Sequence, residues 1–249
     1  MEAICCCLSS KPANHNEFGP EGTSSGLKIK TSLLDTLWKL GLPFNSRKTL
    51  WPLVIGNNLA LTSTMVEEVK KRRREIEEFK KFEVNDPEII CLAETVKEFR
   101  PDIPPIRDLL SISEIFYKAI PNSPLPSLIN LIHMHHFISF YRGEKTEIES
   151  RIQLFEFLLE KNAPKVRDHF IGLKLETRMY LVSWFLNIFS DCFAGQEQFL
   201  LRVWDNFLLE GEIYLFKVGM SIIKYYEIQL KMCTFHEGLK LLRFPKKTS

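Results

Sequence analysis

Residues 202–223 of the chain read RVWDNFLLEGEIYLFKVGMSII and show the apolar spacing of two consecutive helices. A first apolar face leads up to Gly211, a residue type that commonly closes helices, and a second apolar face follows it. The first face consists of Phe199, Leu200, Val203, Phe207 and Leu208. The second face consists of Leu215, Phe216, Gly219, Ile222, Ile223 and Tyr226. Steps of three and four residues are typical of α-helices that bury one side, so this stretch predicts a pair of helices.

The same helical spacing occurs over most of the chain. Two further apolar stripes are Ile152, Phe155, Leu158 and Leu159, and Leu33, Leu34, Leu37, Trp38 and Leu40. No run alternates between apolar and polar residues for long enough to predict a strand. We therefore expect an all-α fold.

The composition limits the classes of protein to consider. With 249 residues, of which 45% are apolar, the chain can bury one substantial core. Its 33 basic and 31 acidic residues leave a net charge of +2, which does not favour nucleic acid as a partner. The longest strongly apolar run without a charge, residues 179–190, falls well short of the roughly twenty residues of a membrane-spanning helix. We expect neither a nucleic-acid-binding protein nor a transmembrane protein.

The beginning of the chain differs in composition from the rest. Its first residues, MEAICCCLSS, lack the basic flank and the long apolar centre of a secretory signal, which predicts a cytoplasmic protein without disulfides. Residues 9–26 are rich in Ser, Gly, Pro and Asn. We therefore expect residues 1–27 to form a flexible tail and residues 28–249 to form the folded domain.

Three adjacent cysteines in the expected tail, Cys5, Cys6 and Cys7, are candidate S-acylation sites. Two attached chains would hold the protein peripherally on endomembranes, whereas one chain would bind only weakly. Glu2 excludes N-myristoylation, which requires glycine at this position. An unmodified tail is the alternative interpretation.

Residues 66–82, VEEVKKRRREIEEFKKF, concentrate charged side chains. Opposite charges recur four positions apart, as in Glu67 with Lys71 and Glu77 with Lys81, beside a broken apolar stripe. This pattern favours a solvent-exposed helix. An electrostatic contact with an acidic membrane or partner is the alternative.

A histidine cluster, His133, His135 and His136, is the remaining candidate for metal chemistry. On one helix only His133 and His136 would share a face, and no nearby Cys or Glu completes a recognisable ligand set. We predict partly buried packing histidines and no metal site. The chain also lacks a glycine-rich phosphate loop and an HExxH sequence, so we expect no cofactor and no enzyme chemistry of its own.

Residues 41–57, GLPFNSRKTLWPLVIGN, combine a turn with an arginine and a tryptophan four residues apart, Arg47 and Trp51. This stretch resembles the opening of the TBC domain, the Rab GTPase-activating module, where a glycine-proline turn precedes R-x-x-x-W. The later part of the chain resembles the R-x-W-D-x-F-x-x-x-G-x-x-x-x-F string of the same family. The matching residues are Arg202, Trp204, Asp205, Phe207, Gly211 and Phe216. The resemblance covers most of residues 37–230 and implies a GTP-bound Rab-family GTPase as the partner.

The family-motif residues also have a structural interpretation that does not depend on the resemblance. Trp51, Trp184 and Trp204 lie on apolar helix faces, which predicts core positions. Asp205 lies near Arg202 in the sequence, so we expect a local hydrogen bond or ion pair between them. We assign these residues no catalytic role.

Residues 100–111, RPDIPPIRDLLS, occupy the place of one of two catalytic motifs that the resemblance implies. In the family, an arginine from I-x-x-D-x-x-R stabilises the transferring phosphoryl group, and a glutamine from Y-x-Q positions the attacking water. Aligned on RPDI, the glutamine position holds Arg107. A guanidinium donates hydrogen bonds but accepts none, so Arg107 cannot orient water as an amide does. Adjacent Pro104 and Pro105 predict that the whole stretch is an extended connector.

The arginine finger has no counterpart in the sequence. The chain contains no I-x-x-D-x-x-R sequence, and the interval between Trp51 and Arg100 is several dozen residues shorter than in the family. The finger segment is therefore missing between residues 57 and 100, and loss in evolution or loss of an exon would leave the same sequence. We predict a Rab regulator in membrane trafficking with weak or absent activating activity. A non-catalytic helical scaffold without a GTPase partner is the alternative.

Overall fold

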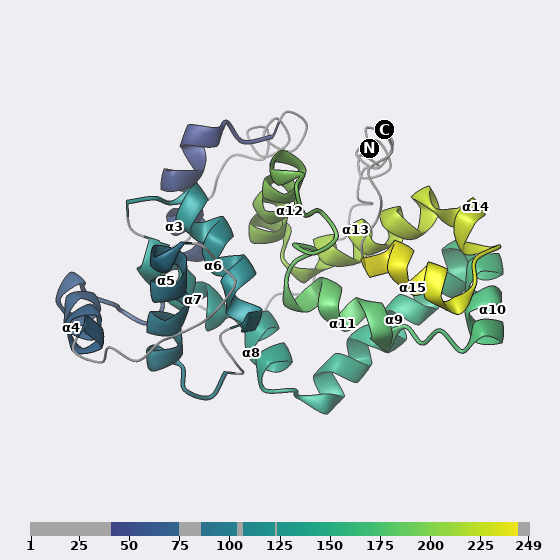
Figure 1. Cartoon of the computed structure of the whole chain (residues 1–249), viewed down its shortest axis with the longest axis horizontal. Helices are drawn as coiled ribbons and strands as arrows, with labels where there is room; N and C mark the ends of the chain where they lie inside the picture. Colours follow the sequence, from purple (N-terminus) through teal and green to yellow (C-terminus); the bar gives the residue numbers. More distant parts are fainter. Residues whose placement is uncertain (1–40, 75–85, 104–106, 123, 244–249) are drawn as a thin grey trace, which may run out of the picture.

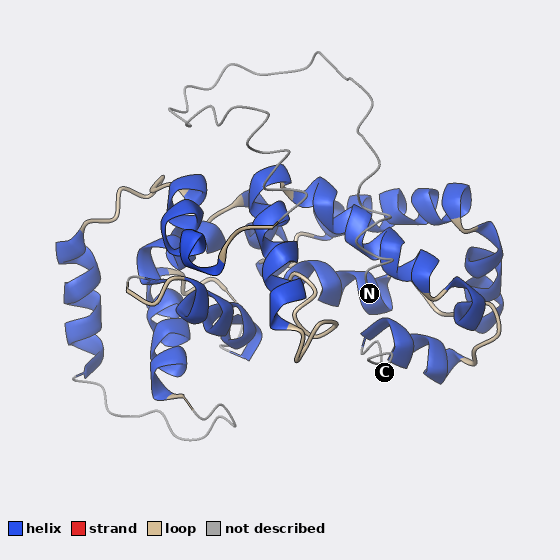
Figure 2. Cartoon of the chain, turned by 90° about the horizontal axis from the view of Figure 1, so that it is seen from above, coloured by secondary structure: helices blue, strands red, loops and turns tan. Residues whose placement is uncertain are grey.

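The structure is a computed structural model that describes residues 41–74, 86–103, 107–122 and 124–243. These residues form helices joined by loops, and no strand occurs among them (Figure 2). The predicted all-α fold is confirmed. None of the helices in these ranges combines the length and the apolar character needed to cross a lipid bilayer.

The helices form two lobes that lie side by side (Figure 1). The first lobe contains the short 3₁₀ turn η1 (Phe44–Ser46), α3 (Arg47–Ile55), α4 (Ser63–Arg74), α5 (Pro87–Phe99), α6 (Arg107–Ala119) and α7 (Pro124–Ile132). Helix α5 packs against both α6 and α7, α3 packs on α7, and α4 lies at the outer edge against α5. The start of α5 is well determined by its sequence, because Asp86 accepts the N–H of Glu88 at 2.9 Å and Pro87 takes the first position.

The second lobe contains the remaining described helices apart from α8. They are α9 (Lys145–Asn162), α10 (Pro164–Leu173), α11 (Arg178–Leu186), α12 (Glu197–Glu210), α13 (Glu212–Tyr225), α14 (Glu227–Leu230) and α15 (Phe235–Arg243). The short helix α8 (His135–Tyr141) joins the lobes, because it contacts α7 on one side and both α9 and α11 on the other. Helix α12 also reaches across and packs on α3.

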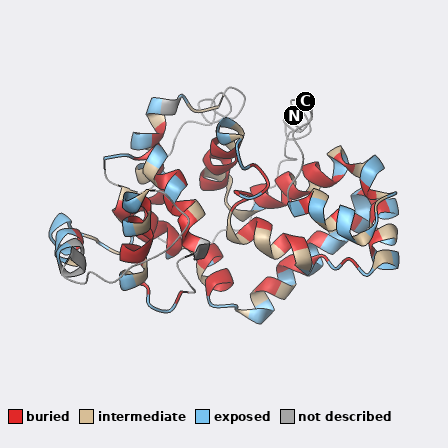
Figure 3. Ribbon diagram, in the orientation of Figure 1, coloured by how far each residue is buried: buried red, intermediate tan, exposed pale blue. Residues whose placement is uncertain are grey.

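The predicted pair of helices in residues 202–223 is confirmed as α12 and α13. Gly211 separates them with a φ of +72°, a backbone conformation that residues with a side chain rarely adopt. Most of the residues on both predicted faces are buried, and Figure 3 shows buried residues along the inner sides of the two lobes.

Gly219 has a packing role at the centre of the second lobe. A Cβ atom at this position would lie 2.8 Å from Cε2 of Phe155 on α9 and 3.1 Å from Cζ3 of Trp184 on α11. Real Cβ atoms almost never approach other atoms this closely, so the absence of a side chain lets α13 approach both neighbours.

Two further helix predictions are confirmed, and the predictions for three other segments are not tested. The stripe on α9 is confirmed, since Ile152, Phe155 and Leu159 are buried. The charged helix is confirmed as α4 up to Arg74. The stripe that begins at Leu33, the tail with its cysteines and the pair Glu77 with Lys81 lie outside the described residues.

Two local expectations were wrong. The three histidines do not share one helix, because α7 ends at Ile132 and α8 begins at His135, with Met134 in an extended conformation between them. The stretch 100–111 is also not a connector throughout. Helix α6 begins at Arg107, because the apolar spacing that starts with Leu109 and Leu110 continues along α6 and buries these residues.

Candidate functional site

The motif residues Arg47, Trp51 and Asp205 meet in a buried contact between α3 and α12, called here the α3–α12 contact. Nε and Nη2 of Arg47 donate to the two carboxylate oxygens of Asp205 at 2.9 and 2.7 Å, and Nε1 of Trp51 donates to Oδ1 at 2.8 Å. Arg47 and Trp51 are one helical turn apart, so both reach the same carboxylate. The two motifs that suggested the family in the sequence are thus one structural unit.

This geometry corrects the prediction that Asp205 pairs with its sequence neighbour Arg202. The carboxylate instead accepts hydrogen bonds from residues 158 and 154 positions away. Removing one partner of a buried ion pair leaves an uncompensated charge, which makes such contacts sensitive to mutation.

The tryptophans confirm the structural interpretation of the motifs. Trp51, Trp184 and Trp204 are fully buried. The ring centroids of Trp51 and Trp204 are 6.1 Å apart, and Phe116 from α6 packs on both. Trp51, Trp204 and Phe116 thus join the two lobes, whereas Trp184 packs within the second lobe against Phe155, Tyr180 and Phe189.

A second polar group, called here the joint network, lies where the lobes meet. It consists of His136 on α8, Arg151 on α9 and Glu212 on α13. The two ring nitrogens of His136 lie 2.8 Å from Oε1 of Glu212 and 2.8 Å from the backbone oxygen of Phe185. Both oxygens are acceptors, so only the doubly protonated imidazole makes both hydrogen bonds together.

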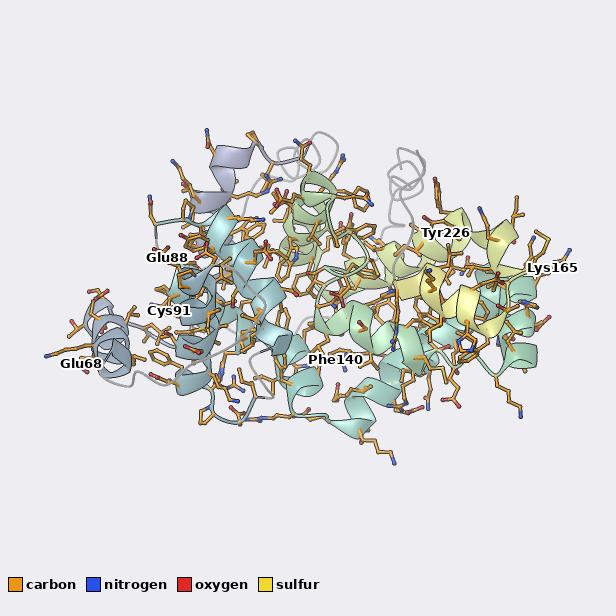
Figure 4. All side chains as sticks on the ribbon, viewed as in Figure 1. Glu68, Glu88, Cys91, Phe140, Lys165 and Tyr226 are labelled. Atoms are coloured by element: carbon orange, nitrogen blue, oxygen red, sulfur yellow. The ribbon has the colours of Figure 1, made fainter. Side chains whose placement is uncertain are left out.

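Arg151 completes the joint network. It donates from Nε to Glu212 and from Nη1 to Oε2 of Glu147 at 2.9 Å, and its guanidinium lies 5.5 Å from the ring centroid of Phe140. Figure 4 labels Phe140 at the junction of the lobes. Burial acts to raise the pKa of Glu212, but the hydrogen bonds from His136 and Arg151 outweigh it and hold that pKa below its usual value.

A third polar group, called here the connector cluster, lies at the C-terminal end of α5. It consists of Arg100, Asp102, His133 and Arg142. Arg100 donates from Nε and Nη2 to the two carboxylate oxygens of Asp102, both at 2.9 Å, and its Nη1 lies 3.1 Å from Nδ1 of His133. Arg142, which follows α8, donates from Nε to Oδ2 of Asp102 at 2.8 Å. The guanidinium of Arg100, aided by Arg142 and opposed by partial burial, holds the pKa of Asp102 well below its usual range.

The connector cluster is the candidate functional site, because it lies beside the stretch that carries the predicted catalytic position. Asp102 and Arg100 belong to that stretch, and Arg107 is the first residue of α6, a few residues further along. The structure does not describe the side chain of Arg107 or residues 104–106, so its proposed role is not tested.

Sequence reasoning missed Arg142 altogether. The prediction of three partly buried packing histidines was also wrong, because His136 is buried in the joint network, whereas His133 and His135 are exposed and His133 is a partner of Arg100. Within the part of the chain that the structure describes, no group of three or more His, Cys, Asp or Glu side chains is placed to hold a metal ion.

A surface hollow of about 490 Å³ lies between α6 and the start of α12. Ile115, Phe193 and Leu200 are among its lining residues. The ammonium group of Lys118 at its edge binds the carboxylates of Glu114 and Glu197. Its cation is therefore already paired with two carboxylates, whereas Arg142 of the connector cluster is paired through Nε alone among the described residues.

Comparison with known proteins identifies the fold. The family model described as the Rab-GTPase-TBC domain matches residues 108–231. The chain belongs to the TBC domain family. The matched residues of this TBC domain run from the first turn of α6 to the end of α14, so the match does not include the predicted finger positions.

The relatives of the TBC domain are distant in sequence. It is 24% identical to TBC1 domain family member 12 of Xenopus tropicalis in an alignment 253 positions long, which covers 84% of this chain and 37% of that protein. It is 26% identical to Drainin of Dictyostelium discoideum over 144 residues, 57% of this chain and 32% of that protein. The chain spans about a third of the length of these curated relatives.

Two solved structures share the fold. The RabGAP TBC domain of a Chlamydomonas flagellar protein superimposes with a TM-score of 0.68 at 18% identity, covering 87% of this chain and 79% of that chain. The Ypt/Rab-GAP domain of Gyp1p superimposes with a TM-score of 0.52 at 18% identity, covering 90% of both chains. At this identity the likeness establishes the architecture of the TBC domain and leaves its activity to direct tests.

Proposed function

We propose that this TBC domain binds Rab-type small GTPases in their GTP-bound form and regulates them in membrane trafficking, with weak or absent acceleration of GTP hydrolysis. Family membership supports a Rab GTPase as the partner. The proposal of weak activity is supported mainly by Arg107, which takes the place of the family's glutamine when the sequence is aligned on RPDI.

The physical reason is the loss of both groups that would stabilise the transition state. An arginine finger contributes about 10³-fold or more to GTP hydrolysis, and the sequence contains no I-x-x-D-x-x-R motif. A glutamine amide donates to and accepts from the attacking water, whereas the guanidinium of Arg107 only donates. The helices of residues 108–231, which match the family, are present, so we expect binding to be retained while catalysis is lost.

The first experiment is a pull-down of purified GTP-loaded Rab proteins by this protein. Binding of at least one Rab is the expected result, and no binding across a complete panel would favour the alternative of a scaffold without a GTPase partner.

Single-turnover GTP hydrolysis then measures the activity of each Rab that binds. We expect an acceleration below about tenfold. A strong acceleration would mean that other residues act as fingers, and Arg107→Ala would then test whether this side chain has taken over the role.

We also propose that the protein is cytoplasmic and associates peripherally with endomembranes through S-acylation of Cys5, Cys6 and Cys7. The support is the sequence, in which three adjacent thiols provide enough sites for two acyl chains. Replacing all three by serine should move the protein from the membrane fraction to the soluble fraction. An unchanged distribution would exclude acylation as the anchor.

A further inference from the structure

Among the described residues, Arg142 is held through one of its three guanidinium nitrogens. Its Nε donates to Asp102, whereas no group in the described part of the chain is hydrogen bonded to Nη1 or Nη2. The side chain is 51% exposed. The outer side of the guanidinium therefore presents free N–H donors to the solvent, in the planar arrangement that matches an oxyanion.

Asp102 does not depend on Arg142 for its charge balance. The nearly buried Arg100 already binds both of its carboxylate oxygens. Because Arg100 can only donate, Nδ1 of His133 acts as the acceptor in this contact. Two arginines and one aspartate leave the connector cluster with one net positive charge, located on Arg142.

We propose that Arg142 is an anchor for a carboxylate side chain of the GTPase partner, a hypothesis that rests on the proposed function. An incoming carboxylate can bond to the terminal nitrogens without displacing Asp102, which uses Nε. One excess positive charge balances one carboxylate, whereas a phosphate group would bring more negative charge than the connector cluster neutralises. Asp102 fixes the orientation of the guanidinium before binding, which reduces the entropy that binding has to overcome.

Arg178 is a matched control on the second lobe. Its side chain is 48% exposed, and it also pairs with one carboxylate, that of Glu149. If exposed charge alone matters, Arg142→Ala and Arg178→Ala will weaken binding equally. If Arg142 is the anchor, Arg142→Ala weakens binding about tenfold or more, while Arg178→Ala changes it by less than about twofold.

Arg142→Lys separates charge from geometry. Lysine keeps the positive charge but loses the planar fork, so it should restore only part of the affinity. Circular dichroism of each variant checks that the helices are intact. Full affinity in Arg142→Lys would show that a bidentate contact is not used and would overturn the proposal.

The partner residue can be found with a double-mutant cycle. Single acidic residues on the surface of the bound Rab are replaced by alanine, and binding is measured with the wild-type protein and with Arg142→Ala. One acidic residue should weaken wild-type binding about tenfold and have little further effect on Arg142→Ala. Lack of coupling to every acidic residue would overturn the proposal.

Inorganic phosphate distinguishes the other source of an oxyanion. Two results together would assign the site to a phosphate instead. Phosphate would compete with the Rab for the wild-type protein more strongly than chloride does at equal ionic strength, and it would not compete for Arg142→Ala. If the wild-type protein binds no Rab at all, the proposed function fails and the anchor fails with it. If binding occurs and Arg142→Ala behaves like Arg178→Ala, the proposed function stands and only the anchor is refuted.

Discussion

Replacing Asp205 by alanine is expected to destabilise the domain strongly. Arg47 and Asp205 are only 6% and 4% exposed, and the carboxylate accepts hydrogen bonds from both Arg47 and Trp51. Asp205→Ala leaves the Arg47 charge buried without compensation and the Trp51 N–H without an acceptor.

The expected loss follows from these two consequences. Breaking one side of a buried ion pair costs about 3–5 kcal/mol, and a buried unpaired donor costs about 1–3 kcal/mol. The two effects overlap because one carboxylate serves both donors, so we expect the free energy of unfolding to fall by about 4 kcal/mol. A typical domain has about 5–15 kcal/mol in total, so the variant should be close to unfolding.

Urea unfolding followed by circular dichroism measures this loss, with Asp168→Ala as the control. Asp168 is 73% exposed and lies 3.7 Å from its neighbour Arg167, so its removal should change the free energy by less than about 0.5 kcal/mol. Asp205→Asn keeps an acceptor for Trp51 and should lose less than Asp205→Ala. A loss below about 1 kcal/mol for Asp205→Ala would refute the role assigned to the α3–α12 contact.

Two further predictions concern the second lobe and the joint. Gly219→Ala should lower the free energy of unfolding by about 1–2 kcal/mol, because the added methyl group would overlap Phe155 and Trp184. The control Gly172→Ala should be neutral or stabilising, because the space around Gly172 is open. Equal effects of the two substitutions in thermal unfolding would contradict this prediction. Glu212 has a lowered pKa when folded, so its contribution is present above the pKa of about 4.5 that it has when unfolded and is lost as the pH falls through the folded value. Glu212→Gln should therefore reduce the difference in stability between about pH 7 and about pH 4, and an unchanged difference would exclude Glu212 as its source.

The helices of this domain could be predicted because apolar spacing is a local property of the sequence. Helices α9, α12 and α13 follow their predicted faces, and Gly211 ends α12 as expected. The start of α6 was missed because two prolines dominated the interpretation of the stretch, although the apolar spacing from Leu109 onward was already present in the sequence.

The polar contacts that join distant parts of the chain could not be predicted from local spacing. Asp205 has an arginine three positions before it, and local reasoning favoured that neighbour over Arg47, which is 158 positions away. Arg142 lies 40 positions from Asp102, in a stretch with no motif that relates the two. Only the folded chain brings the residue after α8 next to the residues that follow α5.

The α3–α12 contact also has a consequence for the synthesis of the protein. A ribosome produces Arg47 and Trp51 long before it produces their acceptor, which follows 158 residues after Arg47. During this interval α3 has an arginine and a tryptophan side chain whose final environment does not yet exist. Domains whose contacts span such distances complete their folding late, and the incomplete chain exposes apolar surface to chaperones and proteases. A message that ends before the codon for Asp205 would therefore yield a chain that cannot complete its first lobe, even though every helix of that lobe is encoded.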